Sequence, residues 1–251
     1  MRQTKILTSL VLLVISFLIS CKKDTSATIT PTDVKASMKQ FSFTASNGTT
    51  YGYWLYTPAN PTTNMPLITY LHGGSGRGND LNLVITGSLP KFLYDSTVKD
   101  IPAYILIPQC PANLTWEQIA TSLIELIDNV SNVKQINQNK ISLTGHSLGG
   151  SGVWKIGATY SSKFSCIAPL SGSVQTNTAS SYTGIPVWAF VGSADVIVDP
   201  ISSTTIVPMI NALGGNAQVK TYNGATHFDV PDLTYKDVSV NLLNWMISKS
   251  K

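Results

Sequence analysis

Apolar and polar positions follow two different patterns along this chain. Residues 41–43 alternate between apolar and polar side chains, and residues 50–56 are rich in aromatic ones, which is typical of strands. Asn47-Gly48 lies between these stretches and is a strong signal for a hairpin turn. We therefore expect the folded domain to begin with an antiparallel hairpin.

Beyond the hairpin, short apolar runs alternate with longer segments in which apolar residues recur every three or four positions. The short runs predict strands at residues 67–71, 103–107, 141–143, 165–170, 186–191 and 219–222. The nearly continuous apolar run at 67–71 is typical of a strand covered on both faces, and 103–107 is expected to be buried as well. The longer segments predict helices within residues 81–94 and at 115–130, 150–160, 206–213 and 235–248. This alternation predicts an α/β fold, with a mostly parallel central sheet and helices on both faces.

Two of these helices carry more specific predictions. Thr115 and Gln118 are spaced as a capping box at the start of helix 115–130. The final helix, 235–248, is expected to turn four apolar side chains inward, namely Val238, Leu242, Trp245 and Met246.

The first twenty residues have a pattern of their own. Arg2 and Lys5 precede an apolar run at residues 6–19, which is short for a membrane span and suited to the core of a signal peptide. Cys21 follows directly, in a setting that resembles a bacterial lipobox. We expect Cys21 to be lipidated after removal of residues 1–20, residues 21–38 to form a flexible tether, and residues 39–251 to form one catalytic domain. The alternative is an ordinary signal peptide with an incidental cysteine.

Composition narrows the functional classes. The 251 residues are 43% hydrophobic and 12% charged, which suits one domain with a substantial core. The net charge of +4 falls to +2 without Arg2 and Lys5, and no basic cluster suggests a nucleic-acid partner. Cys110 and Cys166 are expected at opposite ends of parallel strands, too far apart for a disulfide. The three histidines lack metal-ligand spacing, so we expect neither a metal nor another cofactor.

The chemistry centres on residues 141–150, which read as strand, tight turn and helix with a serine at the apex. Gly145, Ser147 and Gly149 form the pattern G-x-S-x-G, typical of a nucleophile elbow. The glycines are needed because strand and helix pass close together beside a strained serine.

The histidine and acid that such a serine requires are found later in the chain. His227 follows the last predicted strand, whereas His72 and His146 belong to local turns, so His227 is the candidate general base. Asp195 comes shortly after strand 186–191 and is our first choice for the acid, with Asp199 as the alternative. The order serine, acid, histidine is the order found in α/β-hydrolases.

An oxyanion hole needs about two backbone N–H donors. The amide of Leu148 directly follows the serine at the start of a helix. Gly74 lies in a glycine-rich loop after strand 67–71 and is the candidate for the second donor.

These motifs together resemble the α/β-hydrolase esterases of the phospholipase/carboxylesterase and polyhydroxybutyrate-depolymerase-like group, and related peptidases. The matching segments are YLHGGSGRGND at 70–80, IPQCP at 107–111, GHSLGGSGVW at 145–154, APLSG at 168–172, GSAD at 192–195 and GATH at 224–227. The resemblance implies an α/β-hydrolase fold with Ser147 as nucleophile, Asp195 as acid and His227 as base.

The expected function is therefore a serine carboxylic ester hydrolase that works through an acyl-enzyme. Its substrate would be a small-molecule or polysaccharide ester, such as an acetyl or feruloyl ester, and the protein would be a monomer anchored by lipid in the bacterial cell envelope. The segment 173–185 is too short and too polar to form a lid, so we expect an open site. Trp116 and Arg77 are candidate substrate contacts there; the alternative is an ordinary packed tryptophan and a solvated arginine. The alternatives are a small serine peptidase of the same fold and a non-catalytic binding lipoprotein.

Overall fold

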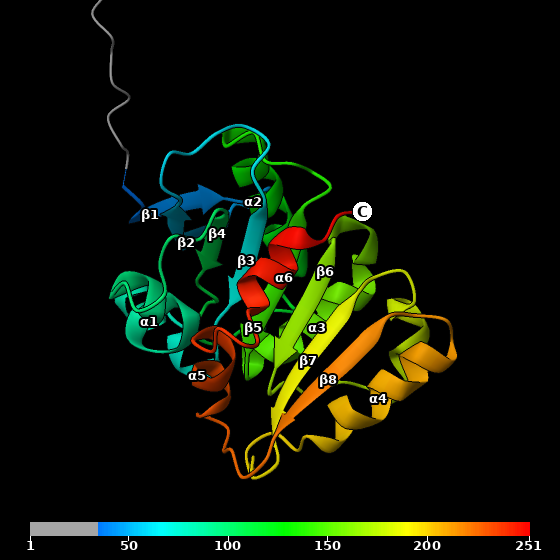
Figure 1. Cartoon of the computed structure of the whole chain (residues 1–251). Coiled ribbons are helices and arrows are strands. Elements are labelled where there is room, and N and C mark those ends of the chain that lie inside the picture. The colour runs from blue at the N-terminus through cyan, green and yellow to red at the C-terminus, as the bar shows by residue number, and fades with distance from the viewer. Residues whose placement is uncertain (1–34) are drawn as a thin grey trace, which may run out of the picture. The chain divides into compact units, whose positions relative to one another are not determined.

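The computed structural model describes residues 35–251, which form one sheet of eight strands with helices on both faces (Figure 1). The expected signal peptide, the expected lipidation site Cys21 and most of the expected tether lie outside these residues. The strands are β1 (Ser37–Thr44), β2 (Thr50–Thr57), β3 (Leu67–Leu71), β4 (Tyr104–Pro108), β5 (Ile141–His146), β6 (Cys166–Leu170), β7 (Val187–Gly192) and β8 (Ala217–Tyr222).

The order of strands in the sheet is β1-β2-β4-β3-β5-β6-β7-β8. The strands β1 and β2 form the predicted hairpin, and β2 also pairs antiparallel with β4. All pairs from β4 to β8 are parallel. The predicted architecture, a mostly parallel sheet with an N-terminal antiparallel hairpin, is confirmed.

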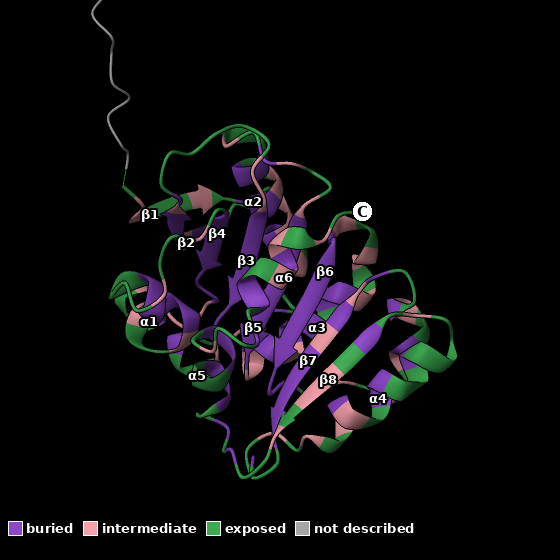
Figure 2. Ribbon diagram, viewed as in Figure 1, coloured by how far each residue is buried: buried purple, intermediate pink, exposed green. Residues whose placement is uncertain are grey.

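Within residues 35–251, six α-helices cover the two faces of the sheet: α1 (Ser88–Tyr94), α2 (Ala120–Val133), α3 (Leu148–Thr159), α4 (Ile201–Ala212), α5 (Val230–Tyr235) and α6 (Leu242–Ser248). Side chains of α2, α3 and α4 pack into one core cluster, and those of α1, α5 and α6 pack into a second. The strands contribute side chains to both clusters, because successive side chains of a strand point to opposite faces of the sheet. In β3, Leu67 and Leu71 belong to the first cluster, and Ile68 and Tyr70 belong to the second. Figure 2 shows β3, β5 and β6 buried along their length and β8, at one edge, partly exposed.

Both remaining cysteines are buried and free, and they lie in different core clusters. The sheet therefore separates Cys110 from Cys166. Burial is the main influence on both thiols and raises the pKa of Cys110 to about 11 and that of Cys166 to about 12.

The start of α2 differs from the prediction. The Thr115 amide does donate to the side chain of Gln118, over 2.8 Å, but the helix begins only at Ala120. Trp116 is fully buried and donates its indole N–H to the carbonyl of His72 over 3.0 Å. This tertiary contact holds residues 116–119 in turns rather than in a helix.

The predicted final helix, 235–248, is wrong as a single element. The chain forms α5 and α6 with a break between them, in which Asn241 has a positive φ of 50° and Val238 is 91% exposed rather than inward. The Asp237 carboxylate accepts a hydrogen bond from the amide of Ser239 at 2.8 Å, a local turn that competes with helix formation. Leu242 and Met246 are buried as predicted.

At the other end, β1 begins at Ser37, so the last two residues of the expected tether are part of the sheet. The side chain of Met38 packs against the second core cluster, which accounts for the earlier start. Among the described residues, no helix is long and apolar enough to cross a bilayer.

Candidate active site

Ser147 lies at the turn between β5 and α3, as the sequence pattern predicted. Its backbone has φ 61° and ψ −120°, a strained conformation for a residue with a side chain. The neighbouring glycines are required by sterics: a Cβ at Gly145 would lie 2.5 Å from the carbonyl oxygen of Leu71, and one at Gly149 would lie 1.9 Å from it. The elbow is thus fixed by close contact of β3 with the start of α3.

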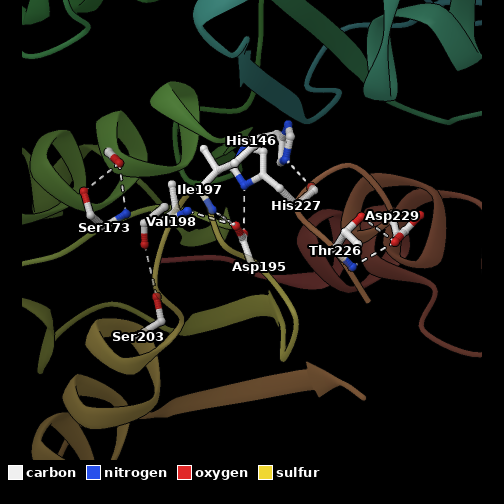
Figure 3. Close-up of polar contacts among 11 residues, drawn as sticks. His146, Ser173, Asp195, Ile197, Val198, Ser203, Thr226, His227 and Asp229 are labelled. Carbon is white, nitrogen blue, oxygen red and sulfur yellow. Dashed lines mark hydrogen bonds and ion pairs between the residues drawn. The ribbon is translucent and has the colours of Figure 1, made fainter. Parts of the chain in front are cut away.

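Asp195 and His227 form a buried hydrogen-bonded pair at the ends of β7 and β8 (Figure 3). His227 Nδ1 lies 2.8 Å from Asp195 Oδ2. The carboxylate can only accept when ionised, so Nδ1 carries the proton, and Nε2 of a neutral ring is left as a proton acceptor.

Asp195 is held in its ionised form by its surroundings. Burial is the largest single influence on its pKa and acts to raise it. Hydrogen bonds from the Val198 amide, the His227 ring and the Ile197 amide together outweigh burial, so the pKa of Asp195 lies below its ordinary value. The two amides donate to Oδ1 over 2.9 and 3.0 Å, leaving Oδ2 to the histidine.

The second acid candidate, Asp199, has a different role. Its carboxylate accepts from the amide of Ile201 at 2.8 Å, at the N-terminus of α4, and the residue is exposed. Asp229 is likewise occupied by a local turn, since its carboxylate accepts from the amide of Thr226. Of these three aspartates, Asp195 is therefore the one hydrogen-bonded to His227.

His146 also contributes to the geometry of the site, although its sequence context predicted only a place in a local turn. Its Nε2 lies 2.9 Å from the backbone carbonyl oxygen of His227 and donates to it, and the two rings pack with centroids 4.6 Å apart (Figure 3). Burial, followed by the nearby His227, lowers the pKa of His146 to about 4, so its ring is neutral near pH 7. His146 thus helps to place the backbone of His227. Its position beside Ser147 was the only sequence signal for this contact.

The glycine-rich loop after β3 runs along the serine. A Cβ at Gly73 would lie 3.4 Å from Ser147 Cβ and 3.9 Å from its Oγ. His72 anchors the loop: its Nδ1 donates to the Gly73 carbonyl at 2.7 Å, and its Nε2 accepts from the Cys110 amide at 3.0 Å. Burial is the main cause that lowers the pKa of His72 to about 4, so this arrangement needs no charged ring.

Gly74 and Leu148, the two candidate oxyanion donors, are each the first residue of a helical segment, a 3₁₀ turn at Gly74–Gly76 and α3 respectively. Amides at such positions have no carbonyl inside their own helix to bond. Arg77 folds back over this loop, with its Nε 3.3 Å from the Gly74 carbonyl. Trp116 is fully buried beneath the loop, which makes it a support of the loop rather than a substrate contact.

A cavity of about 630 Å³ opens beside the serine. Ser147, His146, His227 and the loop residues Gly73 and Gly74 all line it. Within the described part of the chain, no group of three or more histidines, cysteines and acids is placed to hold a metal ion. The arrangement places a serine on a strained turn, a histidine with an ionised partner and the loop residue Gly74 around one cavity.

This combination of sheet order, elbow and loop placement matches known enzymes in their fold. A thermostable esterase superposes with a TM-score of 0.72 at 24% identity, over 85% of this chain and 63% of that protein. The feruloyl esterase module from Clostridium thermocellum superposes with a TM-score of 0.65 at 15% identity, over 86% and 88% of the two chains. An S-formylglutathione hydrolase from Agrobacterium tumefaciens gives 0.67 at 12% identity, over 88% and 98%.

The chain has the α/β-hydrolase fold. A family model described as Phospholipase/Carboxylesterase matches residues 113–235 of the chain, which include the elbow serine, Asp195 and His227. No curated protein has a significant match to the sequence. The family match and the fold support a serine ester hydrolase. The chain spans less than two thirds of the length of the thermostable esterase.

Proposed function

We propose that the protein hydrolyses carboxylic esters through an acyl-enzyme formed on Ser147. The observation that carries this proposal is the buried Asp195–His227 pair, which lines up an imidazole in the same cavity as a serine on a strained turn. Such a pair has a clear chemical use, because an imidazole oriented by a carboxylate can take and return a proton.

In the first half of the reaction, Ser147 Oγ attacks the ester carbonyl carbon while His227 Nε2 takes the hydroxyl proton. The carbonyl oxygen becomes an oxyanion, which the amides of Leu148 and Gly74 stabilise. The bond to the alcohol then breaks, and the alcohol oxygen leaves with the proton from His227. Asp195 stays ionised throughout and stabilises the imidazolium.

In the second half, a water molecule attacks the acyl-serine. His227 takes a proton from this water and returns it to Ser147 Oγ as the acid leaves. The net reaction is ester plus water to acid plus alcohol, so no cofactor is consumed.

The substrates we propose are acetyl or feruloyl esters on polysaccharides. The feruloyl esterase module among the similar structures supports this choice at the level of the fold. We also propose that lipidation of Cys21 anchors the enzyme in the cell envelope, where polysaccharide esters are accessible. Labelling with radioactive palmitate would test the anchor, and a Cys21→Ser variant that still incorporates label would contradict it.

The decisive test of the activity is hydrolysis of short-chain p-nitrophenyl esters by the full-length protein and by Ser147→Ala. We expect the variant to lose about 10⁴-fold or more in kcat/KM. Ser162→Ala is a matched control, because Ser162 is exposed and lies outside the cavity, and it should keep wild-type activity. If the wild type cuts peptides but no ester, a peptidase replaces this proposal. If nothing is cut and a fluorophosphonate does not label Ser147, the protein is a binding protein.

A further inference from the structure

The loop at residues 72–80, which carries the candidate oxyanion donor Gly74, is bridged by a single buried side chain. Gln109 comes directly after β4. Its Nε2 donates to the carbonyl oxygen of Gly76 at 2.9 Å and to that of Asp80 at 2.8 Å. These carbonyls belong to the middle and the end of the loop, so one amide group ties the two parts together.

A glutamine suits this bridge for a chemical reason. Its amide nitrogen carries two N–H groups, so each carbonyl receives one hydrogen. The opposite orientation of the amide would set its oxygen against two carbonyl oxygens, so the loop determines which atom faces it. Gln109 is 3% exposed and Gly76 is buried, so water is a poor substitute for the bond between them.

The 3₁₀ turn Gly74–Gly76 is held only weakly by its own hydrogen bonds. The amide of Gly76 donates to the carbonyl of Gly73 at 3.2 Å, and the amide of Arg77 donates to the carbonyl of Gly74 at 3.3 Å. Both are longer than the most common N–H···O separation of about 2.9–3.0 Å, as is typical of the poorer geometry of a 3₁₀ turn. The shape of this turn therefore depends on bonds from outside it.

Such outside bonds fix both ends of the turn. On the side of β3, the His72 ring donates from Nδ1 to the carbonyl of Gly73 at 2.7 Å. On the other side, Gln109 holds the carbonyl of Gly76. Gly76 also packs against the His72 ring, because a Cβ there would lie 2.6 Å from Nδ1. Gly74 lies between these two fixed points, which set the direction of its N–H group.

We propose that Gln109 is a positioning residue of the oxyanion hole, because it fixes the turn that aims the Gly74 amide at the carbonyl oxygen of the ester. The proposal rests on the ester hydrolase function above, with Gly74 as one of the two donors. Gln109 does not itself line the cavity, so it acts through the loop and not on the substrate. The oxyanion forms only in the transition state, so loss of the bridge should lower kcat and leave KM nearly unchanged.

The test uses Gln109→Met in the full-length enzyme, because methionine is unbranched, similar in length and without an N–H group. We expect kcat for p-nitrophenyl butyrate to fall by about 10- to 100-fold and KM to change by less than about threefold. Active sites are counted from the stoichiometry of fluorophosphonate labelling, so that unfolded protein does not enter kcat. Gln218→Met, at an exposed position of the edge strand β8, is the matched control and should keep both constants.

A transition-state analogue separates positioning from a general loosening of the structure. A trifluoromethyl ketone forms a hemiketal with Ser147 Oγ, and its oxyanion occupies the oxyanion hole. The Ki of this inhibitor should rise in Gln109→Met by about the factor by which kcat/KM falls. The pH dependence of kcat/KM should not shift, because the Asp195–His227 pair is untouched. A side chain that only stabilises the fold would change the melting temperature but not the Ki of the labelled sites.

Gln109→Asn is the second variant, for the case that Gln109→Met does not fold. It keeps two N–H groups but is one methylene shorter, so it cannot reach both carbonyls, and we expect a smaller loss in kcat with a matching rise in Ki. If both variants keep wild-type kcat and Ki, or lose activity through KM alone, the positioning role is refuted while the esterase stands. If neither variant takes the label, Gln109 is required for folding, and the proposal is likewise overturned. A wild type that cuts no ester and takes no label would instead refute the ester hydrolase function.

Discussion

At the scale of single residues, Asp195 and Asp199 provide a matched comparison. An asparagine in place of Asp195 would still accept from the amides of Ile197 and Val198, but the other end of its side chain would offer a donor to the Nδ1 atom of the histidine and favour the wrong tautomer. We expect Asp195→Asn to lower kcat by about 10³- to 10⁴-fold with little change in KM.

Asp199→Asn should leave the same constants nearly unchanged, because asparagine also accepts from the Ile201 amide at the start of α4. Steady-state kinetics on p-nitrophenyl butyrate measures both variants. A large loss in Asp199→Asn together with an active Asp195→Asn would reverse the assignment of the acid.

The positions of the candidate site residues could be predicted where a sequence motif determines both the residue type and its place between secondary-structure elements. Ser147 follows from two glycines at fixed spacing, and His227 from its place after the last strand. The contact of His146 with the His227 carbonyl could not be predicted, because it joins the end of β5 to the loop after β8, 81 residues further along the chain. Only the fold brings these two segments together.

At the scale of elements, β3 packs so closely against the start of α3 that we expect a larger residue at Gly149 to destabilise the protein. A Cβ at Gly149 would sit 1.9 Å from the Leu71 carbonyl oxygen, a backbone atom that cannot rotate away. We expect Gly149→Ala to lower the free energy of unfolding by about 3 kcal/mol or more, at the upper end of what overpacking costs, and to abolish activity by displacing Ser147.

Gly184→Ala is the control for this prediction, because a Cβ there meets no atom within 4 Å and its φ is not positive. It should be neutral or slightly stabilising. Urea unfolding followed by fluorescence compares both variants with the wild type. Equal stability of Gly149→Ala and Gly184→Ala would mean that the elbow is more tolerant than its geometry indicates.

Element types could be read from hydrophobic period, whereas element ends depended on tertiary contacts. Most strands were predictable because continuous buried apolar runs are typical of a sheet covered on both faces, whereas the edge strand β8 is only partly buried. The start of α2 was set by burial of Trp116, and the break between α5 and α6 by the turn at Asp237. The spacing of apolar residues in 235–248 fits one helix. That spacing does not reveal the hydrogen bond from the Ser239 amide to the Asp237 carboxylate, which interrupts the helix.

At the scale of the whole molecule, two buried neutral histidines tie stability to pH. The pKa values of His72 and His146 are both lowered to about 4, mainly by burial, from an ordinary value near 6.5. Between these values the unfolded chain binds protons that the folded chain does not. Stability is therefore fully present above about pH 6.5 and is lost as the pH falls toward 4, by up to about 3 kcal/mol for each histidine.

This acid sensitivity can be separated from that of the carboxylates. Asp195 and the other acids with lowered pKa values contribute stability that is lost only as the pH falls below their ordinary range, near 4. Urea unfolding at pH 7 and pH 5 should thus report the histidines. His146→Gln keeps a side-chain N–H for the His227 carbonyl but does not titrate, so it should remove about half of the loss. A wild type equally stable at pH 7 and 5, or a variant with an unchanged loss, would show that these imidazoles are protonated in the folded protein. That result would also contradict their role as neutral supports of the catalytic loops.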